Sequence, residues 1–183
     1  MDKSKLDNCV EELKGKGMKN WIKNFLTEKV PDYFWEIPAS STGKYHPSYS
    51  LGEGGLVRHT KATVNIAIDL LNNELYNFNN QEQDIIIAAL ILHDTFKHDF
   101  PKEDYSVADH GVIVSKKVLE EDLPKKIKKR LAGALASHMG QWNTDYTTGE
   151  VIAPKPETEL EKFVHLCDYL ASRKFLEINF EEI

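Results

Sequence analysis

Apolar residues recur along most of the chain at spacings of three, four and seven, which is the period of an amphipathic α-helix. Shorter series around residues 6–13 and 21–26 predict two helices near the start of the chain. No segment shows the convincing alternation of a half-buried strand, so the pattern indicates an all-α protein. The longest series predicts a long helix that carries Val57, Val64, Ile68, Leu71 and Leu75.

One apolar run, Ile85–Leu92, fits a buried strand by pattern alone. Its two alanines, the polar stretch NNQEQD before it and its helical neighbours favour a buried helix instead. The run is also far too short to span a bilayer, which needs about 20 apolar residues. We therefore expect a core helix here and no membrane segment.

Capping signals mark the starts of the later helices. Ser106 begins a capping-box pattern, S-x-x-D, that predicts a helix over residues 107–118. Pro124 suits the first turn of the next helix. A T-x-x-E pattern at Thr158 predicts the start of a last helix that reaches Phe175. With loops over residues 38–55 and 140–156, the pattern predicts one domain over residues 1–183, a bundle of about six to eight helices.

Composition and charge narrow the class of protein. The 183 residues are 41 % hydrophobic and 28 % charged, as in ordinary globular domains. The net charge of −6 argues against a protein built mainly to grip nucleic acid, but a nucleotide bound through a metal ion remains compatible with it. The two cysteines form no CxxC pair, and the charged N-terminus is not a signal peptide, so we expect a soluble protein in the cytoplasm.

Six histidine and aspartate side chains fall on the apolar faces or at the ends of five predicted helices. Charged groups on apolar faces are normally paired or bound to metal, and one explanation covers all six: the helices converge on a metal site. Imidazole and carboxylate ligands suit a divalent Mn, Fe, Co, Ni or Zn ion, and Mg²⁺ is also compatible with the carboxylates. The predicted ligands are His59, His93, Asp94, His110, His138 and Asp168.

Taken singly, an inward histidine is more often a hydrogen-bonded core residue than a metal ligand. The adjacent pair His93-Asp94 at the end of the most apolar helix is more specific, and His59 upstream and Asp168 downstream add to it. We interpret His165, three residues before Asp168, as a partner that orients this carboxylate.

The order H…HD…D resembles the HD superfamily of metal-dependent phosphohydrolases. The resemblance runs from about Gly54 to Arg173, through GGLVRHT, LILHDTFK, ADHG, ASHMG and HLCDYLASR, and the motif-bearing core is about residues 54–175. It implies an all-α, HD-type bundle with a metal held by the first His, the HD pair and the last Asp. Members with additional histidines often bind a second metal, which implies the same for His110 and His138, with Asp94 as the bridge.

Two features depart from relatives of this kind. Many members read HDIGK where this chain reads HDTFK, but Lys97 keeps its place and remains a candidate catalytic residue beside Asp94. No GYP motif follows the HD pair, which counts against a cyclic-di-GMP phosphodiesterase of the HD-GYP class. The flanking sequences look closest to bacterial 3′-to-5′ exoribonucleases and to small nucleotide phosphohydrolases.

Two loops and the end of the last helix offer substrate contacts. Positively charged side chains can bind phosphate, and aromatic rings can stack on bases. Either loop is equally explained as a connector, and Lys97 or Arg173 as a solvated side chain. The predicted substrate-binding residues are Lys44, His46, Trp142, Tyr146 and Arg173.

The sequence therefore predicts an enzyme that hydrolyses phosphoester or phosphoanhydride bonds in nucleotides by metal-activated water, with one or two ions. The first alternative is a 3′-to-5′ exonuclease on single-stranded nucleic acid. Such an enzyme needs contacts along the strand, which an acidic one-domain chain supplies poorly. The basic run Lys125–Arg130 fits a solvated helix face better than a strand-binding patch. The second rival is an inactive regulatory protein with the HD fold.

Overall fold

The computed structural model describes residues 2–40, 42–43, 46–145 and 147–175. Within these residues the regular structure is helical, apart from one isolated bridge between Thr144 and Val151, so the all-α prediction is confirmed. Three short 3₁₀ helices accompany the α-helices at Lys3–Leu6, Asp32–Trp35 and Ser48–Ser50. The α-helices are α1 (Asp7–Glu11), α2 (Lys16–Glu28), α3 (Gly55–Leu71), α4 (Asn80–Leu92), α5 (His110–Glu120), α6 (Lys125–Ser137) and α7 (Glu159–Ala171).

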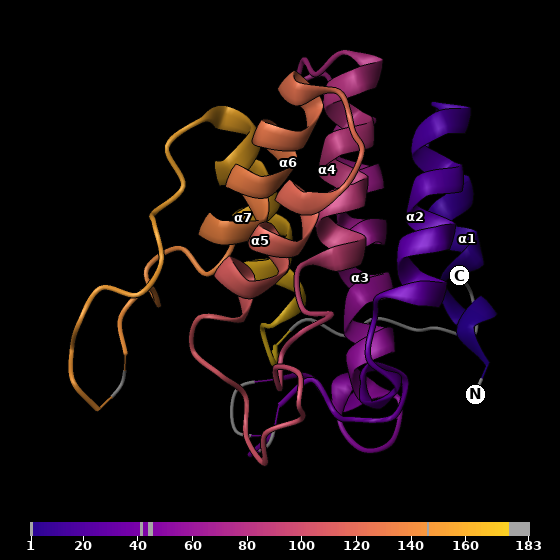
Figure 1. Cartoon of the computed structure of the whole chain (residues 1–183). Helices are drawn as coiled ribbons and strands as arrows, with labels where there is room; N and C mark the ends of the chain where they lie inside the picture. Colours follow the sequence, from indigo (N-terminus) through magenta and orange to yellow (C-terminus); the bar gives the residue numbers. More distant parts are fainter. Residues whose placement is uncertain (1, 41, 44–45, 146, 176–183) are drawn as a thin grey trace.

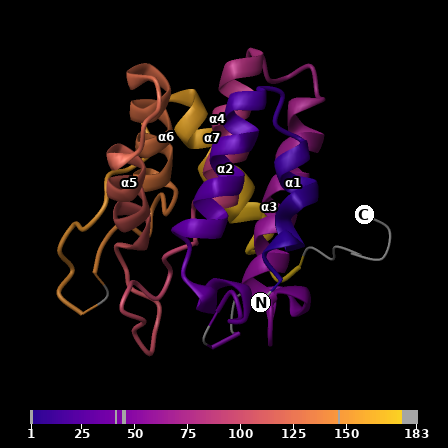
Figure 2. The ribbon, with the colours of Figure 1, turned by 45° about the vertical axis from the view of Figure 1, so that its right-hand side comes forward.

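Helix α4 lies at the centre of the bundle. The pair α5–α6 lies on one side of it and the pair α1–α2 on the other (Figures 1 and 2). Helices α3 and α7 also pack against α4, so every residue from Asp84 to Leu92 is buried. A helix covered all round needs no polar face, which explains the unbroken apolar run and confirms the predicted core helix.

Asp84 is the one charged residue in that buried stretch, and the start of α2 explains it. Its two carboxylate oxygens accept hydrogen bonds from the backbone N–H groups of Lys14 and Gly15, at 2.6 and 2.9 Å. The carboxylate thus satisfies backbone donors at the beginning of a helix, where they lack helical partners. It joins the N-terminal helices to α4.

Two predicted helix ends are wrong. Helix α3 stops at Leu71, and Leu75 beyond it is 82 % exposed. Helix α7 begins at the predicted Thr158–Glu161 capping box but stops at Ala171, so Phe175 lies outside it and is exposed. In both cases the apolar spacing continues beyond the last buried residue of the helix. Because packing against the rest of the protein supplies most of a helix's stability, the helix stops where that burial ends.

The predicted start of α5 is also wrong. The helix begins at His110, and neither Ser106 nor the N-cap residue Asp109 makes a capping hydrogen bond with its side chain there. The backbone N–H of Val107 instead donates to the carbonyl of Lys97 at 2.9 Å, which folds the segment 93–109 back on itself. Residues 106–109 therefore belong to a loop and not to a helical turn.

The longer loops lie at one end and on one side of the bundle. The segment 93–109 lies at the bottom of Figure 1 together with residues 46–54, and the segment 138–158 projects from the side. The Tyr49 hydroxyl donates to the carbonyl of Ala171 at 2.7 Å, which ties the end of α7 to this region. Among the described helices, none is long and apolar enough to cross a membrane.

Candidate metal centre

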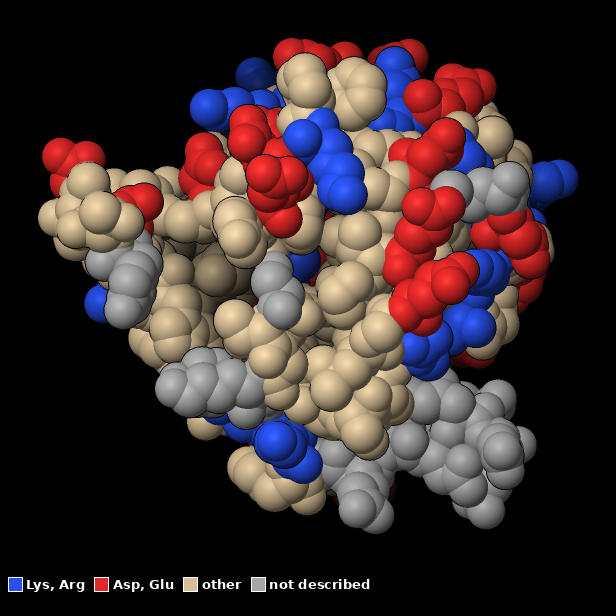
Figure 3. Space-filling view, turned by 90° about the horizontal axis from the view of Figure 1, so that it is seen from below, with Lys and Arg blue, Asp and Glu red and all other residues tan. Residues whose placement is uncertain are grey.

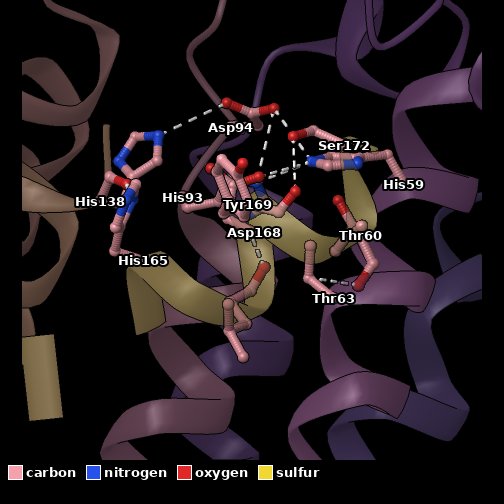
Figure 4. Close-up of polar contacts among 12 residues, drawn as sticks. His59, Thr60, Thr63, His93, Asp94, His138, His165, Asp168, Tyr169 and Ser172 are labelled. Carbon is pink, nitrogen blue, oxygen red and sulfur yellow. Dashed lines mark hydrogen bonds and ion pairs between the residues drawn. The ribbon is translucent and has the colours of Figure 1, made fainter. Parts of the chain in front are cut away.

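Five helices bring the six predicted ligands together. His59 lies near the start of α3, His93 is the C-cap of α4 and precedes Asp94, and His110 opens α5. His138 is the C-cap of α6, and Asp168 lies in the last turns of α7. Five of these side chains are buried and Asp168 is 19 % exposed. Residues up to 109 positions apart in the sequence thus meet in one place (Figure 4).

The six side chains form two groups of three. His59, His93 and Asp168 each offer a ligand atom within 4.8 Å of the others, and so do Asp94, His110 and His138. Three ligands of this kind are what a metal site requires before water or substrate completes the coordination. Two neighbouring ions therefore match the arrangement.

Asp94 lies between the two groups, with His138 on one side and His59 on the other (Figure 4). Its Oδ2 atom is 3.5 Å from His93 Nε2 and 3.9 Å from His59 Nε2. Its Oδ1 atom is 2.9 Å from His110 Nε2 and 3.8 Å from His138 Nε2. Each oxygen thus faces a different group, as a bridging carboxylate does.

Hydrogen bonds to the backbone fix the tautomer of three imidazoles. The Nδ1 atoms of His93, His110 and His138 each lie 2.7 Å from the carbonyl oxygen three residues earlier in the chain. A carbonyl only accepts, so in each ring Nδ1 carries a proton and Nε2 is the atom that faces the centre. This is the usual way in which a protein orients a histidine ligand.

The ligand atoms of the second group lie close together. His110 Nε2 and His138 Nε2 are 3.2 Å apart, with Asp94 Oδ1 beside them. Burial lowers the pKa of His138 to about 3, so this ring is neutral at neutral pH. Burial alone would raise the pKa of Asp94, but Lys97 and His93 hold it well below its usual range. Two imidazole nitrogens and a carboxylate oxygen arranged in this way fit a divalent cation bound between them.

The first group fits a cation as well. His59 Nε2 is 3.0 Å from Asp168 Oδ1 and 3.3 Å from His93 Nε2. Its Nδ1 atom is buried and has no hydrogen-bond partner among the described residues, so the hydrogen bonds of this ring are made through Nε2. Hydrogen bonds to His59 and the neighbouring imidazoles overcome burial and lower the pKa of Asp168, which keeps the carboxylate anionic.

A pocket of about 590 Å³ opens onto the centre. Asp94, His110 and Asp168 line its floor, and a hollow among mostly uncharged residues marks it on the surface (Figure 3). Of the predicted catalytic residues, Lys97 also lines the pocket, and its ammonium lies 2.6 Å from Asp94 Oδ2. The chain therefore places a cation directly beside the bridging carboxylate.

Three predicted substrate-binding residues line this pocket, namely His46, Trp142 and Arg173. The His46 ring packs against the edge of His59, with centroids 5.7 Å apart, and burial lowers its pKa to about 4. His46 is therefore neutral near pH 7 and offers a hydrogen bond, not a charge. The other two predictions, Lys44 and Tyr146, lie outside the described residues.

Tyr169, which packs against the pocket-lining residue Trp142, was not singled out from the sequence. Its ring stacks under Trp142, with centroids 5.9 Å apart and planes at 17°. Its position directly after the predicted ligand Asp168 was the sequence feature that could have indicated a place near the site. The interpretation of His165 is wrong: its Nδ1 donates to the carbonyl of His138 at 2.7 Å, so it orients the chain after His138 and not the carboxylate of Asp168.

Comparison with known proteins gives one match. A family model described as HD domain matches residues 56–173. No curated protein and no solved structure matches the chain. The matched segment contains all six convergent side chains, from His59 to Asp168.

Proposed function

The chain belongs to the HD-domain family, and on that basis we propose that it hydrolyses phosphoester or phosphoanhydride bonds of nucleotides at a two-ion metal centre. The HD domain together with the two ligand groups indicates a metal-dependent phosphohydrolase. The nucleotide substrate and the number of ions are the parts that we add. The observation that carries the proposal is Asp94, whose two oxygens face two separate ligand groups on the floor of the pocket.

The roles of the side chains follow from their positions. A bound divalent metal supplies Lewis acidity, which makes water nucleophilic near neutral pH and offsets phosphoryl charge. Asp94 holds the two ligand groups in register, because its Oδ1 serves one and its Oδ2 the other. Lys97 adds a positive charge at the pocket wall, where charge that develops on phosphoryl oxygens is stabilised. His46 offers a neutral hydrogen bond beside it.

The pocket supports a compact substrate. Its volume of about 590 Å³ lies within the range of about 300–1,000 Å³ found for small-molecule sites. Two cationic side chains, Lys97 and Arg173, line the pocket. The basic run Lys125–Arg130 belongs to α6 and does not line the pocket. A nucleic-acid strand requires an extended basic groove, so we rank a nucleotide above a strand as substrate.

The remaining assignments rest on the sequence. We propose Lys44 and Tyr146 as further substrate contacts, because they belong to the two loops that also supply His46 and Trp142. We also propose a reducing compartment such as the cytoplasm. Cys9 and Cys167 support this, since both are buried and unpaired.

A hydrolysis panel tests the proposal. Nucleoside mono-, di- and triphosphates and single-stranded RNA and DNA are each incubated with the protein and Mn²⁺, Co²⁺, Fe²⁺, Ni²⁺, Zn²⁺ or Mg²⁺. We expect release of phosphate or pyrophosphate from free nucleotides, with little dependence on moderate salt. A chelator and Asp94→Asn should each abolish it, whereas Asp69→Asn, which changes an exposed carboxylate on α3, should leave it intact.

Two results contradict the proposal. Shortening of the oligonucleotides with free nucleotides untouched identifies a 3′-to-5′ exonuclease. Turnover of neither class with any metal, in protein that contains metal, identifies a regulatory protein that retains the fold and the ligands.

A further inference from the structure

Trp142, Tyr169 and Arg173 form a stack at the pocket wall, which we call the ring platform. The Trp142 side chain lines the pocket, is 45 % exposed and lies nearly parallel to the ring of Tyr169. The guanidinium carbon of Arg173 is 4.3 Å from the Tyr169 centroid and 5.4 Å from that of Trp142. Trp142 therefore has a packed neighbour behind it and still offers surface to the pocket.

Two segments of the chain connect the ring platform to the predicted metal ligands. Trp142 follows the ligand His138 by four residues, and Tyr169 directly follows the ligand Asp168. The turn between His138 and Trp142 is closed by two backbone hydrogen bonds, from Gly140 to Ser137 at 3.0 Å and from Trp142 to Met139 at 3.1 Å. The fold thus sets the separation between the platform and the centre.

His165 braces this turn. Its ring lies so close to Gly140 that a Cβ atom there would come within 2.2 Å of it, and the φ angle of Gly140 is +60°. The same ring donates to the carbonyl of His138 and lies 6.4 Å from the Trp142 ring. A glycine is therefore required at this position, and the indole is held in place before any substrate arrives.

Arg173 is held in the stack as well. Its Nε donates to the carbonyl of Tyr169 at 3.2 Å, and its Nη2 donates to the Ser172 hydroxyl at 2.8 Å. A guanidinium over an aromatic face adds a cation–π contact. These bonds restrain Arg173 as part of the platform's edge.

We infer that the ring platform binds the planar base of the substrate by stacking on Trp142, and so selects nucleotides over phosphoesters that lack an aromatic base. The inference rests on the proposed function and adds the basis of substrate selection. Stacking on an aromatic side chain is tolerant of base identity, since every base has a π-face. The enzyme is therefore expected to accept purine and pyrimidine nucleotides alike and to discriminate against sugar phosphates.

Two variants of one residue test the inference in the metal-loaded, full-length protein. Trp142→Leu keeps apolar bulk and removes the π-face, whereas Trp142→Phe keeps a ring. KM and kcat are measured for adenosine 5′-monophosphate, uridine 5′-monophosphate and ribose 5-phosphate. Trp142→Leu should raise KM for both nucleotides about tenfold, leave KM for ribose 5-phosphate unchanged, and leave kcat unchanged. Trp142→Phe should retain most of the nucleotide affinity.

Calorimetric binding of a non-hydrolysable phosphonate analogue of adenosine monophosphate separates this inference from the proposed function. If the wild-type protein hydrolyses no nucleotide of the hydrolysis panel but binds the analogue, and Trp142→Leu loses that binding, the proposed function fails and the platform stands. An equal rise in KM for ribose 5-phosphate, binding that Trp142→Leu does not weaken, or no binding by the wild-type protein overturns the inference.

Discussion

Three of the four histidines at the metal centre are oriented in the same way, each by a backbone carbonyl three residues before it. The arrangement needs no second carboxylate to fix the tautomer, because the turn that ends or begins a helix supplies the acceptor. Side chains oriented before the ion binds lose little freedom on binding it. The same arrangement brings the Nε2 atoms of His110 and His138 to within 3.2 Å of each other.

This geometry predicts the effect of removing one ligand group. The double variant His110→Ala/His138→Ala deletes two of the three ligands of one group and leaves His59, His93 and Asp168 in place. Metal content measured by elemental analysis should fall to half that of the wild-type protein. His98→Asn is the matched control, since His98 is buried but bonds to the Glu103 carbonyl away from the centre. Unchanged stoichiometry in the double variant would make both histidines structural or substrate-contacting.

Residue roles were only partly predictable from the sequence. The six predicted ligands were singled out because charged groups on apolar faces demand a partner, and the structure brings all six side chains together. The resemblance to HD proteins implied a second ion at His110 and His138, but the apolar spacing alone could not show the two groups, since they depend on how five helix ends meet in space. Tyr169 was missed because an aromatic residue on an amphipathic helix is ordinarily core, and only its stack with Trp142 distinguishes it.

At the scale of elements, the contact between α5 and α6 depends on Gly111. A Cβ atom at this position would lie 2.6 Å from the carbonyl oxygen of Leu135 and 2.8 Å from the His138 ring. The first of these atoms is backbone and cannot turn away. The missing side chain thus lets α5 approach α6 closely enough for His110 and His138 to share one group.

Gly111→Ala should therefore destabilise the protein by about 1–3 kcal/mol, the usual cost of overpacking, and lower its metal content by displacing His138. Gly17→Ala is the control: this residue is exposed on α2, and nothing lies within 4 Å of the added Cβ. It should be neutral or stabilise by up to about 1 kcal/mol. Chemical denaturation and metal analysis of both variants check this. Equal stability of the two variants would contradict the close approach.

The sequence located most helices but not all of their ends. The all-round burial of α4 left a clear apolar run, and the capping box at Thr158 marked the start of α7. The ends at Leu75, Ser106 and Phe175 were wrong because apolar spacing and capping patterns are local signals. Tertiary packing and the hydrogen bond from Val107 to Lys97 override them.

At the scale of the whole molecule, the buried centre makes stability depend on pH. Burial lowers the pKa of His138 to about 3 and that of His46 to about 4, from 6.5 in the unfolded chain. Between about pH 4 and 6.5 the unfolded state binds more protons than the folded state, so stability rises with pH. For His93, burial lowers the pKa, but Asp94 and Asp168 raise it above 6.5. The contribution of His93 to the pH dependence of stability therefore lies above pH 6.5.

The metal-free protein should accordingly lose stability as the pH falls from 6.5 to about 4. The midpoint of urea denaturation measured across that range gives the slope. His46→Asn, which removes one of the two titrating rings, should make the slope shallower. A midpoint that is constant, or that rises on acidification, would show that the two imidazoles are not held neutral in the folded protein.

The prediction that residues 1–183 form one domain stays a prediction. Packing of α1 and α2 against α4 supports it, since these helices lie before the segment that matches the HD family. The pocket could not be predicted as a whole, because its walls come from three loops and two helix ends whose approach is set by the bundle. The helical class, in contrast, follows directly from the spacing of apolar residues.

Metal content is the most direct test of the account. Elemental analysis of the purified protein, as isolated and after reconstitution with Mn, Fe, Co, Ni or Zn, should give two ions per chain. Asp94→Ala removes the carboxylate that faces both ligand groups and should leave little or no metal. A folded wild-type protein that retains no metal under any of these conditions would contradict the assignment of His59, His93 and Asp168, with Asp94, His110 and His138, as a metal centre.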